Sequence, residues 1–154
     1  MRGKDLAVDD ALEPAVHRVS PDTRLGDVVD LMVRKRVGAV PVVGERGEVL
    51  GIITSGDVLD QVLRDNPKGD GRPAEALTAR DVMTRSVLCV SEGQPLIEAA
   101  QMMVNKRVEQ LPVVREGLLV GIVTRSKVLR ALHLGSTAEP GEGNQGREPG
   151  EDAT

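Results

Sequence analysis

The chain repeats itself at a fixed spacing, and this duplication constrains the fold more than any other feature of the sequence. Shifted by 71 positions, residues 10–43 match residues 81–114 at 13 of 34 positions. One residue is then lost from the second repeat, so the offset becomes 70 where residues 51–54 match residues 121–124. A repeat of this length indicates two copies of one structural unit in tandem.

Both repeats show the same order of hydrophobic periodicities. A β-branched run comes first, then apolar residues at helical spacing, two strands around a Gly-containing turn, and a second helix. Thr23 is expected to cap the first helix. The sequence therefore predicts an α/β (α+β) fold of two β-α-β-β-α repeats. The expected strands are 16–19, 40–43, 49–53, 87–90, 111–114 and 118–123. Four helices are expected: the first helix of each repeat begins at Leu25 or Leu96, and the second spans about 55–64 or 125–132.

The predicted boundaries follow this repeat and the turn-forming composition between its copies. The first repeat is expected at 8–65 and the second at 78–134. Residues 66–77 are expected to form a linker, because Pro, Gly and polar residues dominate its first half. Residues 135–154 are rich in Gly and Glu and have no large apolar side chain, so they are predicted to be a disordered acidic tail.

Composition argues against several classes of function. The chain has 0% aromatic residues, so it offers no ring on which a nucleic-acid base could stack. The net charge of −4 resides in the tail, and the neutral remainder favours neither nucleic acid nor a membrane surface. One cysteine, Cys89, and two histidines favour a reduced cytoplasmic protein without a zinc site. No nucleophile elbow is present, and no catalytic residue is predicted.

Two short motifs recur in register. Val-Pro-Val-Val at 40–43 precedes Gly-Ile-Ile-Thr-Ser-Gly-Asp at 51–57, and Leu-Pro-Val-Val at 111–114 precedes Gly-Ile-Val-Thr-Arg-Ser-Lys at 121–127. Residues 8–134 therefore resemble a tandem pair of CBS (cystathionine β-synthase) domains. The resemblance implies pseudo-twofold symmetry with the sheets packed face to face. It also implies that an adenosine compound such as AMP, ADP, ATP, S-adenosylmethionine or NAD binds between the repeats and regulates another protein.

Thr54 and Asp57 are the main candidate binding residues. Thr54 ends an apolar strand where a helix begins, so its hydroxyl and the free amides of the first turn suit a phosphate. Asp57 can accept hydrogen bonds from both hydroxyls of a ribose. The same spacing fits a capping box, and this alternative remains open. The resemblance implies that Val40, Pro41 and Val42 clamp the purine, while backbone groups of Val16, His17 and Arg18 read its edge.

The second repeat departs from this pattern at one position. Lys127 aligns with Asp57, and an ammonium group has no acceptor for a ribose hydroxyl. Arg125, beside Thr124, could instead reach a phosphate. We therefore expect one strong adenosine site per chain, and Lys127→Asp is expected to create a second. The degraded or phosphate-favouring cleft of the second repeat would comprise Leu111, Pro112, Val113, Thr124, Arg125 and Lys127.

These features predict a non-enzymatic regulatory module that senses an adenosine nucleotide and signals to an unidentified client protein. No cofactor or metal is expected beyond the regulatory nucleotide. Two amphipathic helix pairs predict a homodimer, because a second copy can cover their apolar faces. The alternative is a structural dimerisation or protein-interaction module that binds no nucleotide.

Overall fold

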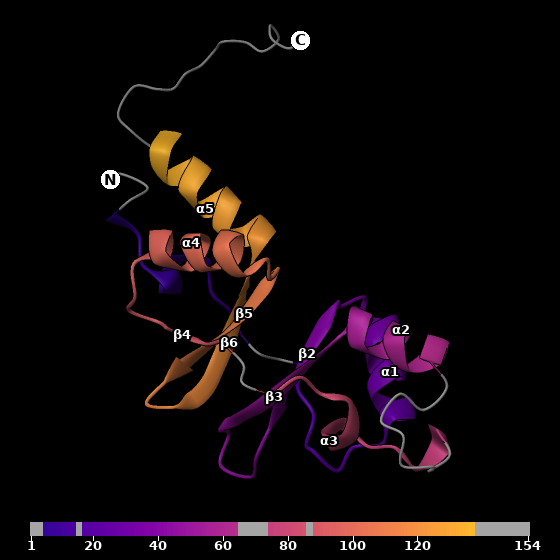
Figure 1. Cartoon of the computed structure of the whole chain (residues 1–154). Coiled ribbons are helices and arrows are strands. Elements are labelled where there is room, and N and C mark those ends of the chain that lie inside the picture. The colour runs from indigo at the N-terminus through magenta and orange to yellow at the C-terminus, as the bar shows by residue number, and fades with distance from the viewer. Residues whose placement is uncertain (1–4, 15–16, 65–73, 86–87, 138–154) are drawn as a thin grey trace, which may run out of the picture. The chain divides into compact units, whose positions relative to one another are not determined.

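The computed structural model of the chain describes residues 5–14, 17–64, 74–85 and 88–137 (Figure 1). The helix-strand-strand-helix order that the periodicity predicts occurs in both repeats, and the structure adds a two-residue strand at 13–14 and a short helix at 79–82. In chain order the elements are a 3-10 turn Val8–Ala11, β1 (Glu13–Pro14), α1 (Leu25–Lys35), β2 (Ala39–Val43), β3 (Val49–Thr54), α2 (Ser55–Arg64), a 3-10 turn Ala74–Ala76, α3 (Ala79–Val82), β4 (Val90–Ser91), α4 (Leu96–Lys106), β5 (Gln110–Arg115), β6 (Leu118–Thr124) and α5 (Arg125–Thr137).

The first strand of each repeat is shorter than its β-branched run predicts. Val19 pairs with Val42 through a single parallel bridge, and the second repeat has only the two-residue strand β4. Val16 and Val87, the first residues of the two runs, lie outside the described residues, so this comparison covers residues 17–19 and 88–90. Val19 is buried whereas Arg18 is exposed, so a single residue of the described run anchors it to the core.

Helices α1 and α4 begin without a side-chain cap. The hydroxyl of Thr23, expected to cap α1, instead accepts the backbone N–H of Ser20 at 3.2 Å. The N–H of Leu25 donates to the carbonyl of Leu77 at 2.9 Å, and the N–H of Leu96 donates to the carbonyl of residue 6 at 2.8 Å. Backbone from a distant segment thus satisfies the first donor of each helix, which explains why Thr23 is not needed as a cap.

Helices α1 and α4 both end just before an arginine, within the basic clusters of the sequence. Arg36 and Arg107 follow α1 and α4 in the left-handed conformation, with φ of 56° and 57°. The basic clusters therefore lie at carbonyl ends, where cations interact favourably with the helix dipole. Helix α5 continues to Thr137, beyond the expected end near residue 132, and Gly135 is buried. Most of the predicted linker and the tail from residue 138 lie outside the described residues.

The described strands form two sheets. Strands β2 and β3 pair antiparallel, with Ala39 opposite Thr54 and Val40 opposite Ile53. The other sheet has the order β1-β6-β5-β4. Because Thr54 is the last residue of β3 and Ser55 the first of α2, the pairing fixes where α2 begins.

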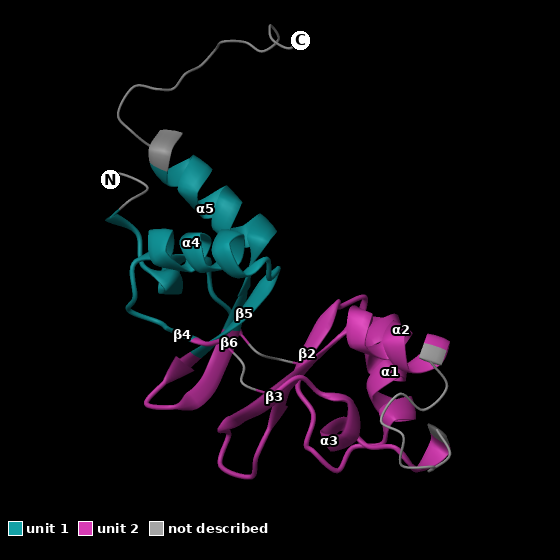
Figure 2. Cartoon of the chain, in the orientation of Figure 1, with its two compact units in different colours: residues 1–13, 90–113, 122–154 teal, residues 14–89, 114–121 magenta. Residues whose placement is uncertain are grey.

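The chain divides into two compact units that do not coincide with the sequence repeats (Figure 2). Unit 1 comprises residues 1–13, 90–113 and 122–154, and unit 2 comprises residues 14–89 and 114–121. Helices α4 and α5 of the second repeat therefore belong to unit 1 together with the N-terminal segment 1–13, whereas α3 belongs to unit 2.

The units differ from the repeats because the segment at the start of each repeat packs with the helices or strands of the other repeat. In unit 1, residues 6–13 pack with α4 and α5, and Val8 donates its N–H to the carbonyl of Gln94 at 2.7 Å. In unit 2, residues 77–84 pack with α1 and β3. Ile52 and Thr84 there exchange two backbone hydrogen bonds of 3.0 and 2.8 Å. We call residues 6–13 and 77–84 the exchanged segments.

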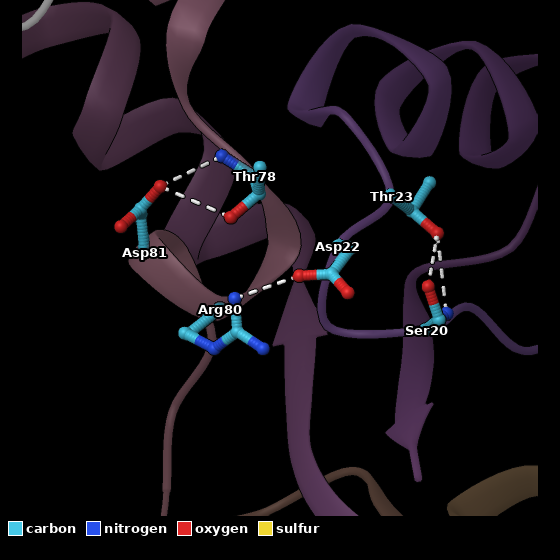
Figure 3. A network of polar contacts seen from close by, with 6 residues as sticks. All are labelled: Ser20, Asp22, Thr23, Thr78, Arg80 and Asp81. Atoms are coloured by element: carbon cyan, nitrogen blue, oxygen red, sulfur yellow. Dashed lines mark hydrogen bonds and ion pairs between the residues drawn. The ribbon is translucent and has the colours of Figure 1, made fainter. Parts of the chain in front are cut away.

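Polar contacts hold the second exchanged segment beside the loop before α1 (Figure 3). Arg80 of α3 forms an ion pair of 2.8 Å with Asp22. Asp81 Oδ2 accepts the backbone N–H of Thr78 at 2.8 Å and its hydroxyl at 3.1 Å, which closes the first turn of α3. The short helix is thereby held by its own cap and by a contact with the neighbouring loop.

The core of unit 2 is wholly aliphatic, as a chain without aromatic residues requires. Leu77, expected to lie in the linker, is 0% exposed and packs with Leu25 and Val82. Burying one such leucine contributes about 1.5 to 3 kcal/mol. The larger cluster also takes Ala79 and Met83 from the exchanged segment. Its buried members are Val19, Val28, Met32, Val40, Val42, Ile53, Ala79 and Met83.

Candidate functional site

Thr54 and Asp57 form a reciprocal hydrogen-bonded pair at the start of α2. The N–H of Thr54 donates to Asp57 Oδ2 at 2.9 Å, and the N–H of Asp57 donates to Thr54 Oγ1 at 3.1 Å. Both residues are half-buried. The capping geometry that the spacing allowed is therefore present. It does not exhaust the carboxylate, because each oxygen can accept more than one hydrogen bond.

The second carboxylate oxygen of Asp57 faces the exchanged segment of unit 2. The hydroxyl of Thr84 lies 3.3 Å from both Oδ1 and Oδ2 of Asp57. These are long hydrogen bonds, and Thr84 is exposed. Oδ1 takes no part in the cap, so this oxygen can exchange the Thr84 hydroxyl for another donor without disturbing the start of α2.

Gly51 makes this neighbourhood possible. A Cβ atom at Gly51 would lie 2.6 Å from Met83 Sδ and 2.9 Å from the carbonyl oxygen of Thr84. Any side chain here would push the exchanged segment away from β3. The glycine of the Gly-apolar-apolar-Thr motif thus serves a close backbone approach that brings Thr84 to Asp57.

The apolar residues expected to clamp a purine lie in β2 within the core. Val40 and Val42 are each 0% exposed, and Pro41 is buried. The carbonyl of Pro41 accepts the N–H of Val19 at 3.0 Å, so the chain just after residues 17–18 runs beside β2. The predicted adenine-reading segment and the predicted apolar wall are therefore neighbours, but the two valines have no exposed surface.

The equivalent turn at the start of α5 contains only half of the box. The N–H of Lys127 donates to Thr124 Oγ1 at 3.2 Å, and the Ser126 hydroxyl lies 3.3 Å from the same oxygen. In place of a carboxylate, the Lys127 ammonium lies 3.4 Å from Glu13 Oε2 of the other exchanged segment. The two turns share a backbone hydrogen bond and differ in charge.

Arg125 does not point along this turn. Its Nε donates to the carbonyl of Val108 at 3.2 Å, and one Nη donates to the carbonyl of Met103 at 3.5 Å. Met103 lies in the last turn of α4, where its carbonyl also accepts the N–H of Arg107, and Val108 follows the helix. In this conformation Arg125 serves that helix end rather than a phosphate. The remaining residues expected around the second cleft, Leu111, Pro112 and Val113, are all buried in β5.

Sequence reasoning missed Thr84 and Glu13 as neighbours of the two turns. Both were visible in the alignment, since Glu13 and Thr84 match at the 71-residue offset. What the alignment could not show is that each residue would approach the turn of the other repeat. That placement follows from the exchange of segments.

The rest of the described chain adds few reactive groups. No three His, Cys, Asp or Glu residues among those described are placed to hold a metal ion. No helix within the same residues is long and apolar enough to cross a membrane. Cys89 is half-buried, and this burial raises the pKa of its thiol above the ordinary value.

Comparison with known proteins assigns the fold. The model of the CBS domain family matches the chain twice, at residues 8–64 and 79–134. The chain belongs to the CBS domain family. The two matches make it a tandem CBS pair and confirm both the predicted resemblance and the predicted α/β class.

Relatives of this CBS pair include parts of larger proteins. Inosine-5'-monophosphate dehydrogenase of Methanocaldococcus jannaschii is 33% identical over 79% of this chain, but the chain spans only 23% of that enzyme. An uncharacterised protein of Methanopyrus kandleri is 30% identical over 82% of this chain, which spans 63% of the relative. The shared part is thus less than two thirds of either protein.

Two of the similar solved structures are CBS proteins with adenosine compounds bound. The chain resembles the structure of CBSX2 in complex with AMP at 32% identity and a TM-score of 0.70. The match covers 81% of this chain and 94% of that one. A further CBSX2 structure is of the protein from Arabidopsis thaliana. The chain also resembles the CBS pair of protein MJ0100 in complex with 5'-methylthioadenosine and S-adenosyl-L-methionine at 25% identity and a TM-score of 0.71, over 81% and 98%. Adenosine is common to these ligands.

Proposed function

We propose that this CBS pair is a regulatory module that binds an adenosine nucleotide beside the turn of Thr54 and Asp57. The observation that carries the proposal is that only one of the two Asp57 carboxylate oxygens takes part in the helix cap. Oδ2 closes the first turn of α2, whereas Oδ1 takes no part in that cap, and the exposed hydroxyl of Thr84 lies 3.3 Å from both oxygens. A ribose hydroxyl can replace such a long contact. AMP bound to the similar CBSX2 structure supports this ligand class.

The other groups of unit 2 would then divide the remaining ligand contacts. The Thr54 hydroxyl would contact a phosphate at the positive end of the α2 dipole. The N–H groups of Ser55 and Asp57 already donate to the carbonyl of Gly38 and to Thr54 Oγ1. Backbone groups of residues 17–18 would read the purine edge, with Pro41 beside them. Val40 and Val42 would hold β2 in place from within the core rather than touch the ligand. An aliphatic site without ring stacking predicts affinity in the micromolar range.

Calorimetric titration of the purified chain with AMP, ADP, ATP, S-adenosylmethionine and NADH tests this proposal. At least one of these ligands should bind with one equivalent per chain. Asp57→Asn should weaken that binding about tenfold to a hundredfold, because the amide offers one acceptor oxygen and no charge. Its remaining oxygen can still accept the N–H of Thr54, so the cap is largely retained.

Asp81→Asn provides a matched control. Asp81 accepts the N–H of Thr78 at 2.8 Å in the same kind of box, on α3 of the same unit. This control should leave nucleotide affinity unchanged while imposing a similar loss of charge on a helix start. Equal affinity for wild type and Asp57→Asn, or no binding of any of the five ligands at millimolar concentration, would refute the proposed site.

Exposed apolar side chains on the helices favour a second role in self-association. Val33 of α1 and the repeat-equivalent Val104 of α4 are 69% and 72% exposed. Leu59 of α2 and the equivalent Leu129 of α5 are 59% and 68% exposed. A second copy that covered these faces would remove them from water, so we propose a homodimer. Light scattering should give twice the chain mass, and Leu59→Asp should shift it toward one chain mass.

The proposed signal passes through such a surface to a client protein. A cytoplasmic location belongs to the same proposal, since a nucleotide sensor with a single cysteine suits that reducing compartment. If the five titrations show no binding while the dimer persists, the structural dimerisation alternative is the better description.

A further inference from the structure

The exchanged segments deliver a different residue to each of the two turns. In unit 2, Thr84 approaches Asp57, and in unit 1, Glu13 approaches Lys127. These residues are equivalent in the duplication, Glu13 to Thr84 and Lys127 to Asp57. Both members of the contact have therefore changed together between the repeats, and each contact remains complementary.

The two contacts differ in what they leave available. Thr84 offers Asp57 a neutral hydroxyl at 3.3 Å, which leaves the carboxylate charge without a cationic partner in this contact. Glu13 and Lys127 neutralise one another at 3.4 Å, with side chains 38% and 48% exposed. The Glu13 carboxylate is thus engaged by the Lys127 ammonium group. Lys127 occupies the position at which unit 2 has its acceptor, Asp57.

We infer that the ion pair of Glu13 and Lys127 closes the nucleotide site of unit 1, so that the residue on the exchanged segment helps decide which repeat binds. This inference rests on the proposed function. Lys127 removes the ribose acceptor, and the Glu13 carboxylate engages the Lys127 ammonium group, whose positive charge would otherwise attract a phosphate. Both changes oppose a nucleotide.

Lys127→Asp alone is therefore not expected to create a second nucleotide site. Lys127→Asp would restore an acceptor at the ribose position but would leave Glu13 beside it without a cation. Carboxylates on these two neighbouring segments would repel one another and would repel a phosphate. A second site therefore requires both residues of the pair to change to their counterparts in unit 2.

Calorimetric stoichiometry with AMP tests this inference on the full chain. Wild type should bind one equivalent, and the double variant Glu13→Thr/Lys127→Asp should bind two. Each single variant should remain at one. The unchanged site in unit 2 reports in the same titration that the variant protein is folded.

The reverse exchange is the matched control. Thr84→Glu/Asp57→Lys carries the ion pair into unit 2 and should reduce AMP binding from one equivalent to none, with the melting transition retained. Two equivalents bound by wild type, a double variant that stays at one, or a second site in Lys127→Asp alone would each overturn the inference. Absence of AMP binding in both wild type and the double variant, with the other four ligands also inactive, would instead reject the proposed function and this inference with it.

Discussion

The turns that open α2 and α5 have a common backbone contact and opposite charges. In both, the N–H of the fourth residue donates to the threonine hydroxyl, at 3.1 Å to Thr54 and 3.2 Å to Thr124. Only in the first turn does the side chain of the fourth residue, Asp57, accept the backbone N–H of the threonine. The duplication has kept the residue that shapes the turn and changed the residue that can bind. Its partner on the exchanged segment has changed as well.

The exchange of segments is the part of this comparison with the largest energetic consequence. Leu77→Ala should lower the free energy of unfolding by about 2 to 5 kcal/mol, because a 0% exposed side chain leaves a cavity beside Leu25 and Val82. Leu6→Ala, the equivalent change in unit 1, should have a smaller effect because Leu6 is only half-buried. Urea titration followed by far-ultraviolet circular dichroism measures both. Leu63→Ala, at an 81% exposed position, is the control, and equal effects of Leu77→Ala and Leu63→Ala would contradict the packing described.

Glycine at the crossing point should be the next most sensitive position. Gly51→Ala places a methyl group 2.9 Å from the backbone oxygen of Thr84, and a shift of that exchanged segment should lower the free energy of unfolding by about 1 to 3 kcal/mol. Gly26→Ala in α1 meets no atom within 4 Å and should instead raise it by about 0.5 to 1 kcal/mol. Thermal melting of the two variants should show shifts of opposite sign. A Gly51→Ala variant as stable as wild type would remove the close approach as an explanation.

The two turns themselves should differ in stability as well as in binding. Asp57→Ala deletes the acceptor for the Thr54 N–H and should lower the free energy of unfolding by about 0.5 to 2 kcal/mol. Lys127→Ala breaks only an ion pair with a 48% exposed side chain and should change it by less than about 1 kcal/mol. High salt should reduce the Lys127 effect and leave the Asp57 effect. Equal losses in urea titrations at high salt would argue against the difference between the turns.

A smaller effect should be the same in both units. Arg36→Gly and Arg107→Gly relieve a left-handed backbone conformation and should each raise the free energy of unfolding by up to about 1 kcal/mol. Lys35→Gly, at the last helical residue of α1, should instead lower it by up to about 1 kcal/mol. Melting temperatures give the sign in each case. Unequal responses of the two arginines would show that the helix ends are not equivalent.

The smallest expected effect concerns pH. Burial raises the pKa of the Cys89 thiol, so the folded chain holds that proton more tightly than the unfolded chain does. The resulting stabilisation is present at neutral pH and is lost as pH rises through the thiol's folded pKa. At pH 8 a disulfide reagent should react more slowly with the native chain than with the urea-unfolded chain. An equal rate would place the thiol in a solvent-like environment.

Most of the helices and strands could be predicted because their signals are local. Alternating and helical periodicities located β2, β3, α1, α2 and their equivalents, and the repeated motifs led to the CBS family. Among residues 17–19 of the strand expected at 16–19, only Val19 is bridged, because a β-branched run describes a residue's preference and not its pairing. Thr23 failed as a cap because a distant carbonyl, that of Leu77, satisfies the first helix donor.

The sequence by itself determined that the chain is a duplicated α/β module with an acidic residue in one turn and a basic residue in the other. These properties depend on residue type and spacing, which are visible in one dimension. Only the tertiary structure decided that each leading segment packs with the other repeat, and hence that Thr84 meets Asp57 and Glu13 meets Lys127. Residues 27 or more positions apart become neighbours through backbone pairing at β3 and β6, and periodicity carries no information about such pairing.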